Sequence, residues 1–368
     1  MSELHILPAS AIAFAVTAAF MVALRPVAMS IGLVDRPGGR KLHIGNIPII
    51  GGLAMFLGIV AGLVAIGVVS RASVSLVFSL FLLVMIGAFD DRYSVSALVR
   101  VVVQIAAILI MAYGSESFLF SIGDPFGVGE IHLGPLTLAS TIIVALTVIN
   151  AYNLVDGVDG LAGMLAVIAL IAVAVVGGFS AISTYVALIV ASSIGAFLLF
   201  NFPVIANRAV RSFMGDAGST LLGFTIFWVT LSISQGESAI ISPVIGLWFA
   251  AIPVFDSLTC FVMRLIAGKS PFQPGRDHFH HTLKRGGFGV RQTLGILSGL
   301  QMFYAILAIV AHYLGVFDVA LFVTWSLLGL TQRWVIKSIS LRHRLYLFRQ
   351  LRAGGLGPYR QARARALR

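Results

Sequence analysis

The sequence predicts an all-α, polytopic membrane protein, on three observations: its long apolar segments, its scarcity of charge, and the placement of its lysines and arginines. Of the 368 residues, 59% are hydrophobic and 11% are charged, and the mean hydropathy is +1.01. A soluble domain carries about 25% charged residues, so an ordinary globular protein is excluded. Cys260 is the single cysteine, which excludes a disulfide framework and a cysteine metal site.

About eleven segments are apolar and long enough to cross a bilayer as helices. The breaks between them fall where Pro, Gly, Asp and Arg cluster, as expected where the backbone leaves a helix near water or inside protein. The first segment has no basic region or cleavage site before it and is interpreted as a retained span. We expect one transmembrane catalytic domain over 1–334 and a basic cytoplasmic tail over 335–368. The predicted spans are 7–29, 48–69, 73–89, 97–113, 136–152, 161–178, 180–200, 218–234, 239–263, 293–313 and 316–332.

The positive charges predict the orientation, because Lys and Arg accumulate on the cytoplasmic side of membrane proteins. With eleven spans and the N-terminus in the periplasm, 24 of the 25 Lys and Arg residues fall on one side, and only Arg71 falls on the other. The sequence therefore predicts a multi-pass membrane protein with a cytoplasmic C-terminus. A basic tail beside anionic headgroups accounts for the net charge of +11, so no nucleic-acid partner is expected.

Eight of the fourteen acidic residues are aspartates at predicted cytoplasmic span ends or loops. An Asp near a membrane is costly and calls for a functional reason. The aspartates lie in polar clusters cut into apolar sequence, and the predicted topology brings all of these clusters to one face, where they would form a site. In chain order the clusters are 35–43, Asp90-Asp91-Arg92, Asn150 to Gly160, 201–203, 213–219, Asp256 and 276–281.

The spacing within the clusters indicates which carboxylates can face the same ligand. Asp156 and Asp159 are three apart, which on a helix places both on one face, whereas Asp90 and Asp91 diverge by about 100° and would split their roles. A metal site that has oxygen ligands and leaves coordination positions open for substrate phosphates favours Mg²⁺ or Mn²⁺. A metal site with a basic rim suits a diphosphate substrate. Zn²⁺ held by the histidines is the alternative, although the spacing lacks His-Glu-x-x-His.

These motifs together resemble the polyprenyl-phosphate N-acetylhexosamine-1-phosphate transferase family, part of the glycosyltransferase 4 or MraY superfamily. The resemblance runs from Asp35 to about Gly287 and is closer to the WecA-like branch, because the chain has Ile47-Pro48-Ile49-Ile50-Gly51-Gly52 where the MraY branch has Thr-Pro-Thr-Met-Gly-Gly. It implies transfer of a sugar-1-phosphate from a UDP-N-acetylhexosamine to undecaprenyl phosphate. UMP would be released, and synthesis of a cell-surface polysaccharide would begin. The donor is expected to be UDP-GlcNAc, with GalNAc or a modified sugar left open.

The resemblance also implies roles for individual residues, and Mg²⁺ or Mn²⁺ as cofactor. Membrane lipids are further expected partners, and a homodimer is left open. Phe213 could instead be a packing residue, and Gly51-Gly52 predicts a close helix contact. The implied catalytic residues are Asp90, Asp91, Asp156, Asp159 and His278; the implied metal ligands are Asp216, Asp91 and Asp156; the implied substrate-binding residues are Arg40, Lys41, His43, Asn153, Phe213, Arg276, His280 and His281.

Two other classes of protein also use aspartates within membranes. A transporter would need carboxylates near the midplane, access from both faces and often inverted repeats, but the clusters here lie at one predicted face and the sequence shows no internal repeat. An intramembrane aspartyl protease would need only two aspartates, and it would leave the basic and histidine-containing loops unexplained. The transferase is therefore the preferred interpretation.

Overall fold

The structure, a computed structural model, describes residues 6–36, 45–67, 70–178, 182–203, 211–237, 239–268, 270 and 277–354. This part of the chain is an assembly of helices with one short antiparallel ribbon, in which Val34 pairs with Pro48 and Asp35 with Ile47. The elements are α1 (Ile6–Ile31), β1 (Val34–Asp35), β2 (Ile47–Pro48), α2 (Gly51–Ala65), α3 (Arg71–Tyr93), α4 (Ala97–Gly114), η2 (Gly134–Leu136), α5 (Thr137–Val155), α6 (Leu161–Gly177), α7 (Ile182–Asn201), α8 (Gly215–Ser234), α9 (Pro243–Phe249), α10 (Ala251–Ile266), α11 (Phe279–Arg285), α12 (Val290–Tyr313) and α13 (Asp318–Gly354).

The helices confirm a polytopic membrane protein. Within the described ranges, 8 helices are long and apolar enough to cross a membrane, and the pair α9 and α10, bent by 87° at its break, would make up to 9. Helices α2 and α6 are apolar but shorter. Each of the eleven predicted segments thus corresponds to one helix or to the bent pair, while a count of eleven complete spans stays a prediction.

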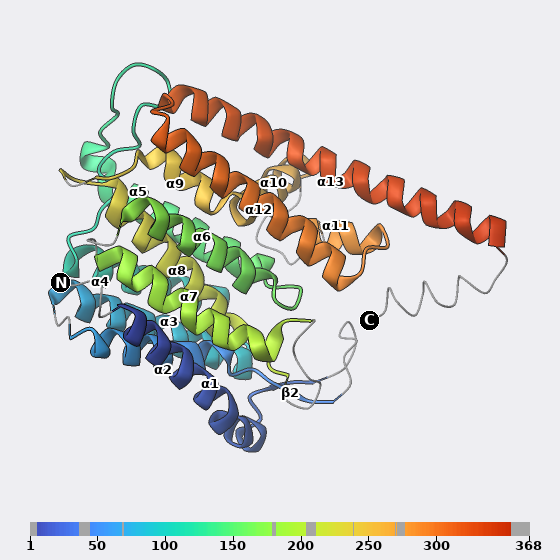
Figure 1. The fold of residues 1–368 in the computed structure, drawn as a ribbon, viewed down its shortest axis with the longest axis horizontal. Helices are drawn as coiled ribbons and strands as arrows, with labels where there is room; N and C mark the ends of the chain where they lie inside the picture. Colours follow the sequence, from blue (N-terminus) through green and yellow to red (C-terminus); the bar gives the residue numbers. More distant parts are fainter. Residues whose placement is uncertain are drawn as a thin grey trace.

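Helix α8 lies at the centre of the bundle, with 89% of its apolar window buried inside the protein, and Figure 1 shows it among α3, α5, α6 and α7. Glycines let neighbouring helices approach it closely, as small residues do in membrane bundles. A Cβ on Gly87 of α3 would lie 2.3 Å from the backbone of Ala217, and one on Gly52 of α2 would lie 2.3 Å from Gly218 N. The close contact predicted for Gly51-Gly52 is confirmed.

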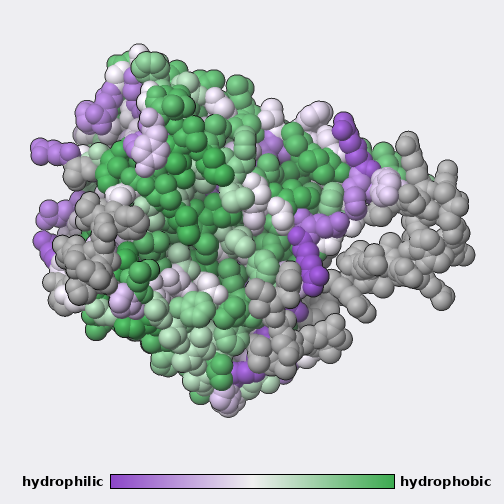
Figure 2. Space-filling model, viewed as in Figure 1, coloured by the Kyte–Doolittle hydropathy of each residue, from purple (hydrophilic) through white to green (hydrophobic). Residues whose placement is uncertain are grey.

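The surface has the distribution of polarity that a bilayer requires. Hydrophobic residues cover the middle of the face shown in Figure 2, and hydrophilic ones gather toward its two ends. Many large apolar side chains of the described residues are exposed, among them Phe78 at 50% and Phe303 at 56% exposure. Lipid tails, which do not penalise exposed apolar area as water does, are the surroundings in which such a surface is stable.

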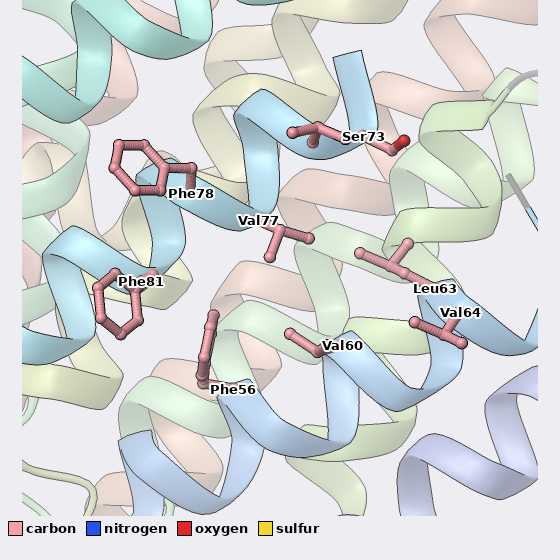
Figure 3. Close-up of a pocket in the computed structure, with 9 residues that line it drawn as sticks. Phe56, Val60, Leu63, Val64, Ser73, Val77, Phe78 and Phe81 are labelled. Carbon is pink, nitrogen blue, oxygen red and sulfur yellow. The ribbon is translucent and has the colours of Figure 1, made fainter. Parts of the chain in front are cut away.

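An apolar hollow of about 370 Å³ opens between α2 and α3 (Figure 3). Its walls come from Phe56 and Val60 on one helix and from Val77, Phe78 and Phe81 on the other. Among the described residues, the lining includes no ionisable side chain, and Ser73 supplies its one hydroxyl. An apolar space of this kind can accept a hydrocarbon chain but cannot neutralise a phosphate. The polar chemistry must therefore lie elsewhere, and the ends of the helices are where ionisable groups gather.

Helix α13 runs without interruption through positions 334 and 335, where the sequence suggests that the catalytic domain ends, and it extends beyond the bundle (Figure 1). Its projecting part is attached to α11: Ser340 Oγ donates to Thr282 O at 2.7 Å, and His343 Nδ1 lies 3.0 Å from Gly286 O. The first part of the basic segment is thus helical and contacts α11, the helix that carries His280 and His281. The division into a domain and a tail stays a prediction.

Candidate active site

Three connections bring five carboxylates together at one end of the bundle, and we call this group the aspartate cluster. Asp90 and Asp91 come from the end of α3, Asp156 and Asp159 from the connection between α5 and α6, and Asp216 from the first turn of α8. The expectation that Asp156 and Asp159 share a helical face is wrong, because α5 ends at Val155 and both residues lie in the loop that follows.

The loop between α5 and α6 turns sharply because of its glycines. Gly160 has φ +77°, a conformation that costs glycine little and other residues more. Its N–H donates to Asn201 Oδ1 at 2.7 Å, and Asn201 Nδ2 donates to Ser212 O at 2.9 Å. Asn201, at the end of α7, therefore connects this loop to the segment that leads into α8. The local turn, and not helical periodicity, fixes where the two carboxylates lie.

Asp91 caps the N-terminus of α8. Its Oδ1 accepts from Asp216 N at 3.0 Å and its Oδ2 from Ala217 N at 3.4 Å. The first turn of a helix leaves its N–H groups unpaired and carries partial positive charge, so a carboxylate there is stabilised. Asp90 points to other partners, Val95 N at 2.7 Å and Arg100 Nη1 at 2.7 Å. The two adjacent aspartates do divide their contacts, as their spacing predicts.

Gly215 makes the approach of Asp91 to α8 possible, and we expect Gly215→Ala to remove nearly all activity. Its φ is +73°, and an added Cβ would lie 2.3 Å from Asp91 Oδ2 and from Ile49 Cγ2. Gly236→Ala is the matched control, since Gly236 has φ +79° but, apart from Gly236 itself and its two chain neighbours, no atom of the described residues would lie within 4 Å of the added Cβ. Strain at positive φ costs about 1 to 2 kcal/mol in either variant. Activity per folded molecule should fall in Gly215→Ala and not in Gly236→Ala. Equal activities of the two variants would refute the steric role of Gly215.

Asp216 is bound from two sides. Asn153 Nδ2 donates to its Oδ1 at 2.8 Å, and Arg100 Nη1 to its Oδ2 at 3.3 Å. Arg100 therefore bridges Asp216 and Asp90 across α3, α4 and α8. No role for Arg100 was predicted from the sequence. An arginine one turn into a mainly apolar helix does, however, indicate a functional residue. A guanidinium between two carboxylates can also turn toward a phosphate oxygen.

Asp156 is the member of the cluster that most needs a cation. No hydrogen-bond donor or basic side chain among the described residues contacts its carboxylate, which lies in the negative fields of Asp216, Asp159 and Asp91. Burial, followed by these three charges, raises the pKa of Asp156 to about 8. The donor atoms are carboxylate oxygens, the set preferred by Mg²⁺ and Mn²⁺. The residues present therefore fit such an ion, with Asp156 and Asp216 as candidate ligands and Asp91 beside them.

The raised pKa of Asp156 predicts a pH dependence of Mg²⁺ binding. Below about pH 8 the carboxyl group of the metal-free protein is mainly protonated, whereas a metal ligand must be ionised, so binding displaces a proton. Apparent Mg²⁺ affinity should rise toward pH 8, by up to about tenfold per pH unit, and level off above it. Calorimetry of the purified protein in buffers of different ionisation enthalpy measures the released proton. Affinity independent of pH would contradict this assignment.

Asp159 and Phe213 meet at Arg211. Arg211 Nη2 forms an ion pair with Asp159 Oδ2, and its guanidinium lies over the Phe213 ring, 5.3 Å from the centroid. The backbone of Phe213 contacts the end of β2 and the start of α2, donating to Pro48 O at 2.9 Å and accepting from Gly51 N at 3.0 Å. The ring is half-buried. The substrate-binding role of Phe213 stays a prediction, and the guanidinium of Arg211 beside its ring is a contact that no local sequence pattern indicates.

The histidine cluster, His278, His280 and His281, borders the aspartate cluster. The ring centroids of His280 and His281 are 4.2 Å apart, and those of His278 and His280 are 5.9 Å apart. A Cβ on Gly157 would lie 2.3 Å from His280 Nε2, so this ring abuts the residue after Asp156. Burial, followed by three neighbouring basic side chains of which His281 contributes most, lowers the pKa of His280 well below its usual value. His280 is therefore neutral. Arg40, Lys41, His43 and Arg276, also predicted to bind substrate, lie outside the described residues.

The fold and this site define a class of membrane glycosyl transferases. Residues 73–234, which include all five carboxylates of the aspartate cluster, match the model of glycosyl transferase family 4. The chain belongs to this family.

Among its relatives, the undecaprenyl-phosphate alpha-N-acetylglucosaminyl 1-phosphate transferase of Escherichia coli (strain K12) is 37% identical over 307 residues, or 82% of each chain. The enzymes of the same name from Salmonella typhi and Haemophilus influenzae are 38% identical over 305 residues and 36% identical over 326 residues. These alignments cover 82% of this chain and 82% of the Salmonella protein, and 86% of this chain and 91% of the Haemophilus protein. The resemblance inferred from the motifs is confirmed.

Proposed function

We propose that this protein transfers N-acetylglucosamine-1-phosphate from UDP-N-acetylglucosamine to undecaprenyl phosphate and releases UMP. The observation that carries the proposal is the convergence of the aspartate cluster, Arg100 and the histidine cluster at one end of an apolar helix bundle. The anionic donor, which arrives from water, and the anionic acceptor, which is held in the bilayer, must meet there. The relatives that share the family act, by their names, on undecaprenyl phosphate.

In the proposed reaction, an oxygen of the lipid phosphate attacks the β-phosphorus of the UDP-sugar. The bond from that phosphorus to the oxygen bridging to the α-phosphorus breaks, and UMP leaves with the bond's electron pair. Because one phosphoanhydride replaces another, the protein has to position two anions rather than supply driving force. The lipid phosphate, with a second pKa of about 6, is mostly ionised at neutral pH, so Asp90 is better suited to orienting Arg100 than to removing a proton.

The proposal includes a divalent metal, Mg²⁺ or Mn²⁺, which when bound would neutralise diphosphate charge. Asp216 and Asp156 would hold it, and Asn153, which donates to Asp216 Oδ1 and also lies 3.1 Å from Ser219 Oγ, would orient that carboxylate. Arg100 and the histidine cluster would bind the phosphate oxygens not used by the metal. Arg211 and Phe213, flanking the aspartate cluster, would form one wall of the nucleotide site.

The proposed location is the bacterial inner membrane, with the site on the cytoplasmic face. The test uses two variants, Val128→Cys and Lys284→Cys, each of which adds one cysteine at an exposed position, and the two positions lie at opposite ends of the bundle. In intact cells with a permeabilised outer membrane, a membrane-impermeant maleimide should label the first and not the second. Wild type is the control, because Cys260 is buried. The reverse labelling would place the site in the periplasm.

The donor is tested with membranes that contain the protein, undecaprenyl phosphate and a panel of radiolabelled UDP-sugars. Label from UDP-N-acetylglucosamine should enter the lipid phase, and label from UDP-glucose should not. Entry of label from UDP-N-acetylgalactosamine alone would keep the reaction and change the sugar. If no UDP-sugar labels the lipid, the proposed activity is wrong.

A further inference from the structure

Asp256 is a buried carboxylate for which the proposed reaction has no role so far. It lies on α10, is 1% exposed, and contacts two adjacent residues, His278 of the histidine cluster and Phe279, with its two oxygens. Oδ1 accepts from Phe279 N at 2.8 Å, which fixes the backbone at the start of α11. Oδ2 lies 3.2 Å from His278 Nδ1. The Asp256 side chain thus fixes both the ring of His278 and the main chain of the next residue, Phe279.

We propose that Asp256 is the positioning residue for His278, turning its Nε2 toward the diphosphate of the bound sugar nucleotide. This inference rests on the proposed function. Within the described part of the chain, Nδ1 makes the hydrogen bonds of this ring, and Nε2 makes none. Since the partner of one ring nitrogen determines the orientation and proton of the other, Asp256 selects the atom that His278 offers.

The charge of the pair favours the same role. A carboxylate that is 1% exposed needs a cationic or donating partner, because an unpaired buried charge is strongly destabilising. Burial alone would lower the pKa of His278, but its hydrogen bonds to Asp256 and Cys260 and their charges raise it to about 10. His278 is therefore an imidazolium at neutral pH, in contrast to neutral His280. As an imidazolium its Nε2 carries a proton and can donate to a phosphate oxygen.

A metal site is the competing interpretation of the same residues. The ligand atoms of Asp256, Cys260 and His278 all lie within 4.8 Å of one another. However, Arg333 Nη1 is 3.7 Å from Cys260 Sγ, and a guanidinium beside a ligand opposes a second cation. Phe279 N already occupies one oxygen of Asp256. These contacts favour a hydrogen-bonded ion pair, and zinc binding becomes one outcome of the test.

The test is a double-mutant cycle on purified protein, with Asp256→Asn, His278→Ala and the double variant. Asn is isosteric and keeps an oxygen for Phe279 N, but it removes the charge. We expect Asp256→Asn to lower kcat by about 10- to 100-fold, the range for groups that orient a functional imidazole, with a smaller change in KM for the UDP-sugar. In the His278→Ala background the same substitution should change kcat by less than about twofold. Thr259→Val is the matched control on α10, since the Thr259 hydroxyl donates to its own helix.

A second readout does not depend on catalysis. In protein labelled with ¹⁵N-histidine, the signal missing from His278→Ala should report an imidazolium at about pH 8 in the wild type, and a neutral ring in Asp256→Asn. A full kcat in Asp256→Asn, or an equal loss in both backgrounds, would overturn the proposal. So would zinc inhibition that Cys260→Ser abolishes, which would reassign the three residues to a metal site. An inactive wild type that keeps the imidazolium signal would refute the proposed function and leave the pair intact.

Discussion

Asp216→Asn is expected to lower transfer to undecaprenyl phosphate by about 10³-fold or more at any Mg²⁺ concentration, because the amide removes the negative charge that a divalent cation requires. The shape of the side chain is unchanged, and its oxygen can still accept from Asn153, whose Nδ2 lies 2.8 Å from Asp216 Oδ1. Abundance in the membrane should therefore stay near that of the wild type. The measurement is the initial rate of lipid labelling per unit of purified protein, over a titration of Mg²⁺.

The control for this substitution is Glu130→Gln, which removes a negative charge from an exposed residue at the opposite end of the bundle. Its activity should equal that of the wild type. Recovery of Asp216→Asn at high Mg²⁺ would mean that the aspartate only strengthens metal binding and that other carboxylates can hold the ion. Unaltered activity without added Mg²⁺ would show that Asp216 is not a ligand.

His278→Ala is expected to reduce turnover by about 10²- to 10³-fold, the loss typical of removing one charge-stabilising donor from an active site. The ring contributes more to charge than to packing: it is an imidazolium paired with Asp256, and its Nε2 makes no hydrogen bond within the described residues. However, the substitution leaves Asp256 buried without its cation, which adds a stability cost of about 3 to 5 kcal/mol. We therefore expect a lower midpoint of thermal unfolding together with a lower kcat.

Separating these two effects requires activity per folded molecule. His132→Ala, an exposed histidine near Glu130 at the opposite end, is the matched control and should change neither quantity. Restoration of stability without turnover in His278→Gln would support the role in binding phosphate. If the folded fraction of His278→Ala keeps the wild-type kcat, the residue is structural, and the phosphate-binding role passes to His281 or Arg100.

The sequence predicts the helical bundle well because apolar length is a local property. Segments as long as Ile6–Ile31 and Arg71–Tyr93 are readable without knowing their neighbours. The bent pair Pro243–Phe249 and Ala251–Ile266 shows the limit of this reasoning. Composition alone makes it one span, while a bend of 87° places α10 across the direction of α9 and carries Asp256 to the histidine cluster.

The members of the candidate site were predictable as residue types, but their contacts were not. The spacing of Asp156 and Asp159 fits one face of a helix, but the chain at these residues, with Gly160 at positive φ, forms a turn instead. The contacts of Arg100 and Asp256 could not be predicted because their partners are far away in the chain: Arg100 contacts Asp216, and Asp256 contacts His278. Contacts of this kind depend on how helices pack, which no local pattern encodes.

Purified protein in detergent micelles that contain undecaprenyl phosphate and radiolabelled UDP-N-acetylglucosamine allows a test of metal-dependent transfer at the aspartate cluster. The assay measures labelled lipid and released UMP together, in excess EDTA and after Mg²⁺ is restored. We predict equal amounts of the two products with Mg²⁺, neither in EDTA, and recovery of both on adding the metal back. Full transfer in EDTA, or UMP released without labelled lipid, would contradict this account.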